Sequence, residues 1–162
     1  MQTRAEQIAG IRADQQFWRD LAAEVGPDRY GEPGPMGDWT FGDMAGHLLG
    51  WRNRTIARLE AAARGEPDPI PFEPDTDDEI DAANVEMRDN DAGRPPAELV
   101  DAYTYSYDRL IRALEALPDS MLTDPTALPF AEGPLIDAAF TGHLHEEHAL
   151  DVRAWLDEQR GA

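Results

Sequence analysis

The chain has four histidines, and three of them fall within the short stretch HLHEEH at positions 143–148. The fourth, His47, lies far upstream in the stretch MAGHLLGW. Imidazole nitrogens bind Zn²⁺, Ni²⁺ or Fe²⁺, and they also exchange protons near neutral pH. The same residues also occur on exposed helix surfaces without any chemical role. The spacing must decide between a metal site, acid–base chemistry and a plain helix surface.

The step of an α-helix, about 100° per residue, orders the three clustered histidines around one helix. When the angle of His148 around the helix axis is set at zero, His145 lies at about 60° and His143 at about 220°. Val152 and Trp155 share the face of His148, which the apolar side chains mark as buried. We therefore predict that His145 and His148 face the interior and that His143 is a surface residue.

His47 lies on a second amphipathic segment, at the edge of the apolar stripe that includes Met44. Helical bundles form cofactor sites between facing helices, so His47 can meet the inward pair of the last helix. Three imidazoles with further positions open are typical of a catalytic Zn²⁺, Ni²⁺ or Fe²⁺ site. The predicted ligands are His47, His145 and His148, with Asp151 close enough in azimuth to support them.

Other polar residues lie near the predicted mouth of this site. Arg54, Arg58 and Asn84 are candidates to bind a polar ligand or cofactor there. The alternative for both arginines is ion pairing with the many carboxylates of the chain. Without a metal, His47 or His148 would be the catalytic residue, acting as a general base.

The elements that must position these residues are helices. Four segments have the apolar spacing of amphipathic helices, and no strand-like alternation competes with them. They cover about 4–25, 40–64, 96–117 and 135–158, with a shorter helix at 76–90 in a Pro-rich acidic connection. Thr40 with Asp43, and Thr76 with Glu79, have the spacing of capping boxes. We predict an all-α protein, a four-helix bundle in a single domain over 1–162, whose long crossover lets helices 2 and 3 run parallel.

Composition excludes several classes of function. The chain has 33 acidic residues against 14 basic ones, for a net charge of −19, which disfavours nucleic-acid binding. It has no cysteine, so disulfides, thiolate ligands and a cysteine nucleophile are excluded. All basic residues are arginine, which excludes Schiff-base lysine chemistry. No apolar run approaches the roughly 20 residues that span a bilayer, and we expect a soluble cytoplasmic protein that does not bind membranes.

Two motifs resemble those of a known superfamily. The stretch MGDWTFGDMAGHLLGW is similar to the helix-two signature of DinB/YfiT-like proteins, and Trp39, Thr40, Asp43, His47 and Trp51 fill its positions. The stretch HEEHALDVRAW resembles the helix-four signature, carried by His148, Asp151, Val152, Arg153 and Trp155. The crossover resembles that of ClbS/DfsB-like proteins and of mycothiol maleylpyruvate isomerase N-terminal domains.

The resemblance implies a four-helix bundle, often dimeric, with a divalent metal held by one histidine of helix two and two residues of helix four. It also implies S-transferases or isomerases that use a low-molecular-weight thiol, or, in ClbS-like members, protection against an electrophilic natural product. The family's helix-four pair would place a ligand at position 144, where this chain has Leu144. Either the site is rebuilt with His145, or the metal site has been lost.

Two functions from different classes follow. The first is a metal-dependent enzyme in which an external thiol, such as mycothiol, or a water attacks a small electrophile. The second is a metal-free, ClbS-like hydrolase or sequestering protein that confers resistance to a reactive metabolite. A bundle that only binds a ligand is a third. In each case we expect small molecules and a second copy of the chain, as a homodimer, to be the partners.

Overall fold

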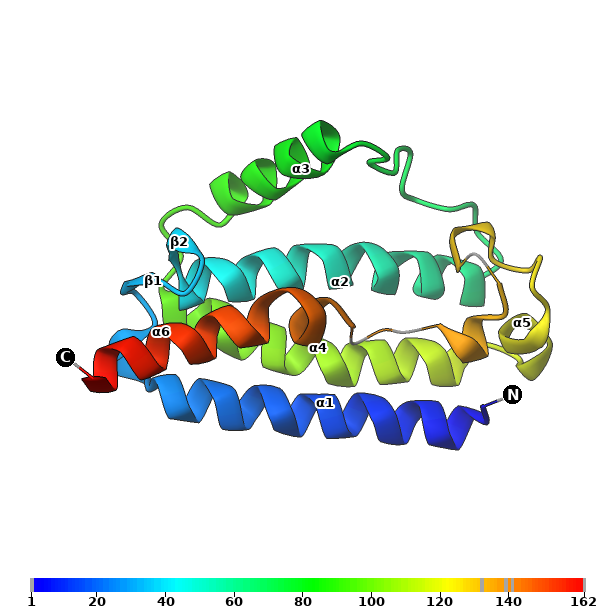
Figure 1. Cartoon of the computed structure of the whole chain (residues 1–162). Helices are drawn as coiled ribbons and strands as arrows, with labels where there is room; N and C mark the ends of the chain where they lie inside the picture. Colours follow the sequence, from blue (N-terminus) through cyan, green and yellow to red (C-terminus); the bar gives the residue numbers. More distant parts are fainter. Residues whose placement is uncertain (1, 132, 139, 141, 162) are drawn as a thin grey trace.

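The structure is a computed structural model that describes residues 2–131, 133–138, 140 and 142–161. Its long helices are α1 (Arg4–Val25), α2 (Phe41–Ala63), α4 (Pro96–Ala116) and α6 (Ala149–Gly161), and a π-helical turn (Leu144–His148) leads directly into α6. In Figure 1, α2 and α4 run in the same direction, whereas α1 and α6 run in the opposite one. The predicted all-α bundle with parallel second and third long helices is confirmed.

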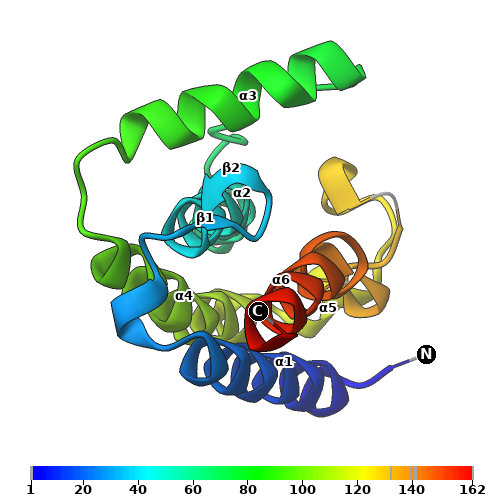
Figure 2. The ribbon, with the colours of Figure 1, turned by 60° about the vertical axis from the view of Figure 1, so that its left-hand side comes forward.

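The crossover between α2 and α4 contains a helix of its own, α3 (Asp77–Asn90). Viewed towards one end of the bundle, α3 lies outside the four long helices, over α2 (Figure 2). None of its residues is fully buried, which agrees with its acidic, weakly apolar sequence. The crossover therefore forms a roof over one face of α2 rather than part of the core.

Each of three helices begins at a threonine that forms a reciprocal capping box. Thr40 accepts from the Asp43 amide while the Asp43 carboxylate accepts from the Thr40 amide, and Thr76 pairs with Glu79 in the same way. Thr3 caps α1 through Glu6. Because these side chains satisfy amides that have no partner within the helix, they fix where each helix starts. The starts of α2 and α3 agree with the sequence prediction.

The core between the helices is aromatic at its centre. The Trp18 ring stacks on Phe41 with centroids 5.0 Å apart and meets the Tyr103 ring edge-on at 4.7 Å. Trp18 also donates its indole N–H to Thr104 Oγ1 at 2.9 Å. These contacts join α1, α2 and α4 and bury large rings without leaving a polar atom unpaired.

The last predicted helix begins later than the sequence indicated. Residues Leu135–Asp137 form a short 3₁₀ turn, and Ala138 after it has an extended backbone with ψ of 135°. Leu135 and Ile136 are buried, but they reach the core from this turn and not from a continuous helix. Positions 139 and 141 of the predicted helix lie outside the described residues. Shorter turns surround this region: α5 (Asp119–Thr123) and a 3₁₀ turn at Pro129–Ala131.

A small hairpin was not predicted. It follows a 3₁₀ turn at Pro27–Arg29 and pairs β1 (Pro33–Gly34) with β2 (Gly37–Thr40) in antiparallel fashion. Gly37 at its turn has φ of +64°, a backbone conformation that favours glycine. The strands are too short and too exposed to produce apolar alternation, which explains why no strand is detectable in the sequence.

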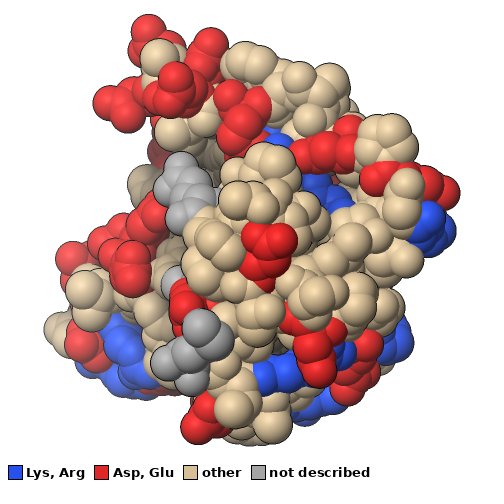
Figure 3. All heavy atoms as spheres, turned by 90° about the vertical axis from the view of Figure 1, so that its right-hand side faces the viewer, with Lys and Arg blue, Asp and Glu red and all other residues tan. Residues whose placement is uncertain are grey.

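The surface reflects the acidic composition. On the face drawn in Figure 3, Asp and Glu side chains are spread over its whole extent and Arg side chains lie in smaller groups. Across the described ranges of the chain, every helix is too short or too polar to cross a membrane.

The start of α2 packs closely on the start of α4. A Cβ atom added at Gly42 would lie 2.6 Å from Pro96 Cβ and 2.8 Å from its Cα. We expect Gly42→Ala to destabilise the protein by about 1–3 kcal/mol in urea unfolding, because the Pro96 backbone cannot yield. Gly10→Ala is the matched control, since nothing lies within 4 Å of its added Cβ. The control should stabilise by up to about 1 kcal/mol. Equal effects of the two substitutions would contradict the close packing.

Candidate metal centre

Three histidines converge between α2 and the last helix. The Nε2 atom of His47 lies 3.1 Å from that of His143 and 3.3 Å from that of His148, and the latter two are 3.2 Å apart. His47 and His148 are buried, at 3% and 7% exposure, and His143 is half-buried. Their three Nε2 atoms thus form a nearly equilateral triangle at the edge of the core.

The triangle has the dimensions of a ligand set for one metal ion. Nitrogens bound to a common ion at about 2.0–2.1 Å lie about 2.9–3.4 Å apart in octahedral or tetrahedral arrangements. Hydrogen bonding alone satisfies this cluster poorly. Each Nε2 carries either one proton or one lone pair, so at least one of the three pairs must be donor–donor or acceptor–acceptor. The residues present therefore fit a divalent cation.

The position of His143 corrects the sequence analysis, which predicted it to face solvent. Leu144–His148 is a π-helical turn, in which the Ala149 amide donates to the Leu144 carbonyl five residues back. In an α-helix, residues five apart differ by about 140° in azimuth, but a π turn brings them onto one face. His143 and His148 therefore point the same way.

The same turn also accounts for Leu144. The extra residue of the π turn places His143, five residues before His148, where an α-helix would place a residue four before it. Leu144 itself points into the core and is 1% exposed. A leucine at the expected ligand position is thus compatible with a three-histidine cluster.

His145, a predicted ligand, lies elsewhere. Its Nε2 atom contacts the Asp14 carboxylate of α1, and its ring lies 4.2 Å from that of Phe17. The π register turns His145 away from α2 and towards α1, so the structure does not bring it together with His47 and His148. The expectation that His145 and His148 share a face was wrong, because it assumed an uninterrupted α-helix.

The three clustered histidines are poised to be neutral. Burial, together with nearby His143 and His148, lowers the pKa of His47 to about 3, while a hydrogen bond with Asn84 opposes these effects. Burial likewise lowers the pKa of His148 to about 4, assisted by His143. The pKa of His143 is lowered by burial and by the charge of Arg52. Neutral imidazoles present the lone pairs that a metal ion requires.

Aromatic and polar side chains surround the cluster. The Trp39 ring meets the His47 ring edge-on at 5.8 Å. The Nδ1 atom of His47 is buried and has no hydrogen-bond partner within the described residues. A carboxylate oxygen of Glu147 lies 3.5 Å from His143 Nε2, and Glu147 and Asp151 both raise the pKa of His148. Negative charge close to the cluster favours a bound cation.

The polar candidates at the mouth contact the crossover. Arg54 and Arg58 both form ion pairs with Glu73, and Arg58 also pairs with Asp68. These contacts are the ion pairs that the sequence left open as the alternative. Asn84 accepts a hydrogen bond from the Trp51 indole at 2.9 Å. Asn84 lies near His47. That Arg54, Arg58 or Asn84 binds a cofactor remains a prediction.

A buried polar network lies beside the cluster. Arg52 donates to Tyr103 Oη at 2.7 Å and to Ser106 Oγ at 3.1 Å, and its guanidinium lies over the rings of Tyr103 and Tyr107. Asp14 accepts from Tyr107 Oη at 2.6 Å and lies 4.0 Å from Arg52. The network therefore connects Asp14, which His145 contacts, with Arg52, whose charge lowers the pKa of His143.

Sequence reasoning missed this network. Arg52 and Asp14 are only 8% and 4% exposed. Asp14 lies among polar residues in its helix, so the apolar spacing gives no sign that it is buried. Tyr103 and Tyr107 carried the detectable signal: two tyrosines one turn apart on a core-facing stripe need partners for their hydroxyl groups.

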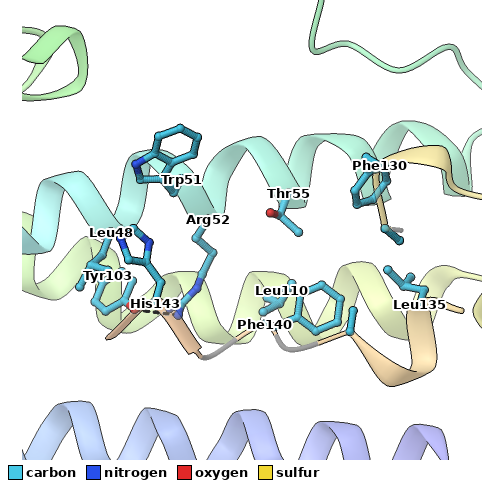
Figure 4. A pocket seen from close by; sticks show the side chains of 12 residues that line it. Leu48, Trp51, Arg52, Thr55, Tyr103, Leu110, Phe130, Leu135, Phe140 and His143 are labelled. Atoms are coloured by element: carbon cyan, nitrogen blue, oxygen red, sulfur yellow. Dashed lines mark hydrogen bonds between the residues drawn. The ribbon is translucent and has the colours of Figure 1, made fainter. Parts of the chain in front are cut away.

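Two hollows meet at the histidines. The first, here called the inner chamber, has a volume of about 400 Å³ and lies between α2, α4 and the segment before the π turn. Its lining includes Arg52, Thr55, Phe130, Phe140 and His143 (Figure 4). The second, the outer groove, has a volume of about 690 Å³ under the crossover and is lined by Trp39, His47, Asn84, Val85 and His148. Trp51 and His143 border both. The cluster is thus reachable from two sides.

Comparison with known proteins gives one family. The sequence profile of the mycothiol maleylpyruvate isomerase N-terminal domain matches residues 11–157. Two uncharacterized proteins of Mycobacterium tuberculosis, from strains CDC 1551 / Oshkosh and H37Rv, are each 30% identical over 158 residues. The match covers 90% of this chain but 54% of each relative, so the chain spans about half their length. No solved structure matches the chain.

The lowered pKa values predict how stability depends on pH in the metal-free protein. A histidine in the unfolded chain has a pKa near 6.5, whereas in the folded protein the pKa is about 3 for His47 and about 4 for His148. Between these values the unfolded chain binds more protons, so stability is fully present above about pH 6.5 and is lost as the pH falls.

The loss should approach about 1.4 kcal/mol per pH unit for each histidine. Urea unfolding of metal-free protein from pH 7 to pH 5 measures it, above the range in which most carboxylates titrate. In the variant His47→Asn/His148→Asn the slope should be clearly smaller. An unchanged slope would show that these histidines are not held neutral in the fold.

Proposed function

The chain belongs to the family of mycothiol maleylpyruvate isomerase N-terminal domains, and from that premise we propose that it is a metal-dependent enzyme. In this proposal it transfers a low-molecular-weight thiol to an electrophilic small molecule. One observation carries the proposal: the triangle of three Nε2 atoms 3.1–3.3 Å apart, formed by two buried histidines and one half-buried one, each with a lowered pKa.

His47, His143 and His148 would hold the divalent ion. Imidazole ligands suit Zn²⁺, Ni²⁺ and Fe²⁺, and the chain supplies no thiolate that would change this preference. When bound, the ion would lower the pKa of a thiol so that its reactive thiolate form predominates near neutral pH. The cluster provides three protein ligands, which leaves room for such an exogenous one.

The thiol must come from outside the chain, because the chain has no cysteine. The outer groove is the proposed entry for a polar thiol cofactor. Its wall carries the side chains of Asp81, Asn84 and Glu147 beside His47 and His148, so hydroxyl and amide groups of a sugar-type thiol would find partners there. The family's association with mycothiol supports this class of cofactor.

The residues of the chain also control proton transfer and access of water. Burial and mutual repulsion keep His47 and His148 unprotonated, so neither needs to lose a proton before binding the ion. Trp39 and Trp51 line the outer groove beside the cluster, where their rings limit the space open to water. The exposed carboxylate of Glu147, 3.5 Å from His143 Nε2, is the proposed acceptor of the proton that the thiol releases.

The strongest test compares two histidines of the same hexapeptide. Tag-free wild-type protein should contain close to one equivalent of zinc, nickel or iron by elemental analysis. His143→Ala should reduce metal affinity by roughly tenfold or more, because it removes a ligand. His145→Ala is the matched control and should retain the metal, since His145 contacts Asp14.

Two results would refute the metal centre. The first is a wild-type protein that stays empty after incubation with Zn²⁺ and Ni²⁺. The second is loss of metal in His145→Ala with retention in His143→Ala. Thiol transfer is then measured as loss of free thiol with an electrophile, before and after removal of the metal by a chelator. The proposal requires a rate that disappears with the metal and returns when it is restored.

A further inference from the structure

The inner chamber is mostly apolar but has one strongly polar spot. Leu48, Leu110, Phe130, Leu135 and Phe140 contribute apolar or aromatic surface to it. Against this surface stands the guanidinium of Arg52, which extends from α2 into the space towards α4 (Figure 4). A chamber of this size and character is typical of a site for a small organic molecule.

Arg52 has donors to spare. A guanidinium carries five N–H groups. Within the described part of the chain, two of them donate to protein atoms, Tyr103 Oη and Ser106 Oγ. The rings of Tyr103 and Tyr107 cover its faces, with centroids 4.2 Å and 3.8 Å from Cζ. Only the edge of the guanidinium is left for a ligand, and an edge binds a hydrogen-bond acceptor.

The charge balance decides which acceptor fits. The positive charge of Arg52 already has a buried counter-charge in Asp14, at 4.0 Å. A carboxylate ligand would bring a second negative charge close to Asp14, in a protein whose net charge is already −19. A neutral carbonyl oxygen accepts the same N–H groups without that repulsion.

We propose that the inner chamber binds a neutral, apolar carbonyl compound, with its carbonyl oxygen on the edge of Arg52 and its apolar body against Phe130 and Phe140. The inference rests on the proposed function, because it names the class of electrophile that this function would use. His143 borders both the chamber and the outer groove. The electrophile and the thiol would therefore reach the histidines from two different hollows.

A matched pair of probes tests the charge argument directly. Benzylacetone and hydrocinnamate share a phenylethyl body and have equal numbers of non-hydrogen atoms, but one ends in a ketone and the other in a carboxylate. Binding to metal-free protein is measured by isothermal titration, so the result does not depend on catalysis. We expect benzylacetone to bind about tenfold more tightly or better. Equal or tighter binding of hydrocinnamate would overturn the proposal.

Two tryptophan substitutions locate the bound ketone. Ala138→Trp fills the inner chamber and should abolish binding of benzylacetone. Val85→Trp is the matched control in the outer groove, and it should leave binding unchanged. Arg52→Met should remove the preference for the ketone over hydrocinnamate. If Arg52→Met does not fold because Asp14 loses its counter-charge, the tryptophan pair still decides. Unchanged binding in Ala138→Trp contradicts the chamber.

The same titrations separate this inference from the proposed function. His148 does not border the inner chamber among its described lining residues, so His148→Ala should bind benzylacetone like the wild type even after its metal site is destroyed. A protein that binds the ketone but never a metal would keep this inference and lose the proposed enzyme. A protein that binds a metal but prefers hydrocinnamate would keep the proposed enzyme and lose this inference.

Discussion

The π-helical turn at Leu144–His148, in which the Ala149 amide donates to the Leu144 carbonyl, sets the arrangement of the histidines. The turn rotates each side chain of the segment relative to its position in an α-helix. Leu144 then enters the core, His145 reaches Asp14 on α1, and His148 reaches His47 on α2. The turn is therefore the point at which packing of the bundle and geometry of the candidate centre are joined.

The buried network of Arg52 and Asp14 extends this connection through the core. Buried charges are costly unless they are paired and hydrogen-bonded, and here both have several partners. Asp14 accepts a hydrogen bond from Tyr107 and contacts His145. Arg52 donates hydrogen bonds to Tyr103 and Ser106. The network thus links the π turn to the wall of the inner chamber. A core built only for stability would have favoured apolar side chains at these positions, so we interpret the network as part of the functional architecture.

Much of the fold was readable from the sequence because it depends on local patterns. The capping boxes at Thr40 and Thr76 fixed two helix starts, and the long Pro-rich connection implied the parallel arrangement of α2 and α4. The family was also predictable, since the motif around His47 is local. The hairpin at 33–40 was not predictable, because its strands are short and exposed.

The ligand set could be predicted only in part. His47 and His148 converge as the motifs suggested, but the third member is His143 and not His145. No periodicity argument finds a π turn, because one extra residue in the turn changes azimuth without changing composition. The only sequence signal was the leucine at position 144, which showed that an uninterrupted helix would lack a ligand there.

The most direct measurement is the long-range ¹H–¹⁵N spectrum of the histidine side chains, recorded on the protein with and without Zn²⁺. The account predicts that three imidazoles, those of His47, His143 and His148, bind zinc through Nε2, while the shifts of His145 stay those of a ring paired with a carboxylate. A spectrum in which zinc shifts His145 instead of His143, or in which it shifts no histidine, would contradict the account.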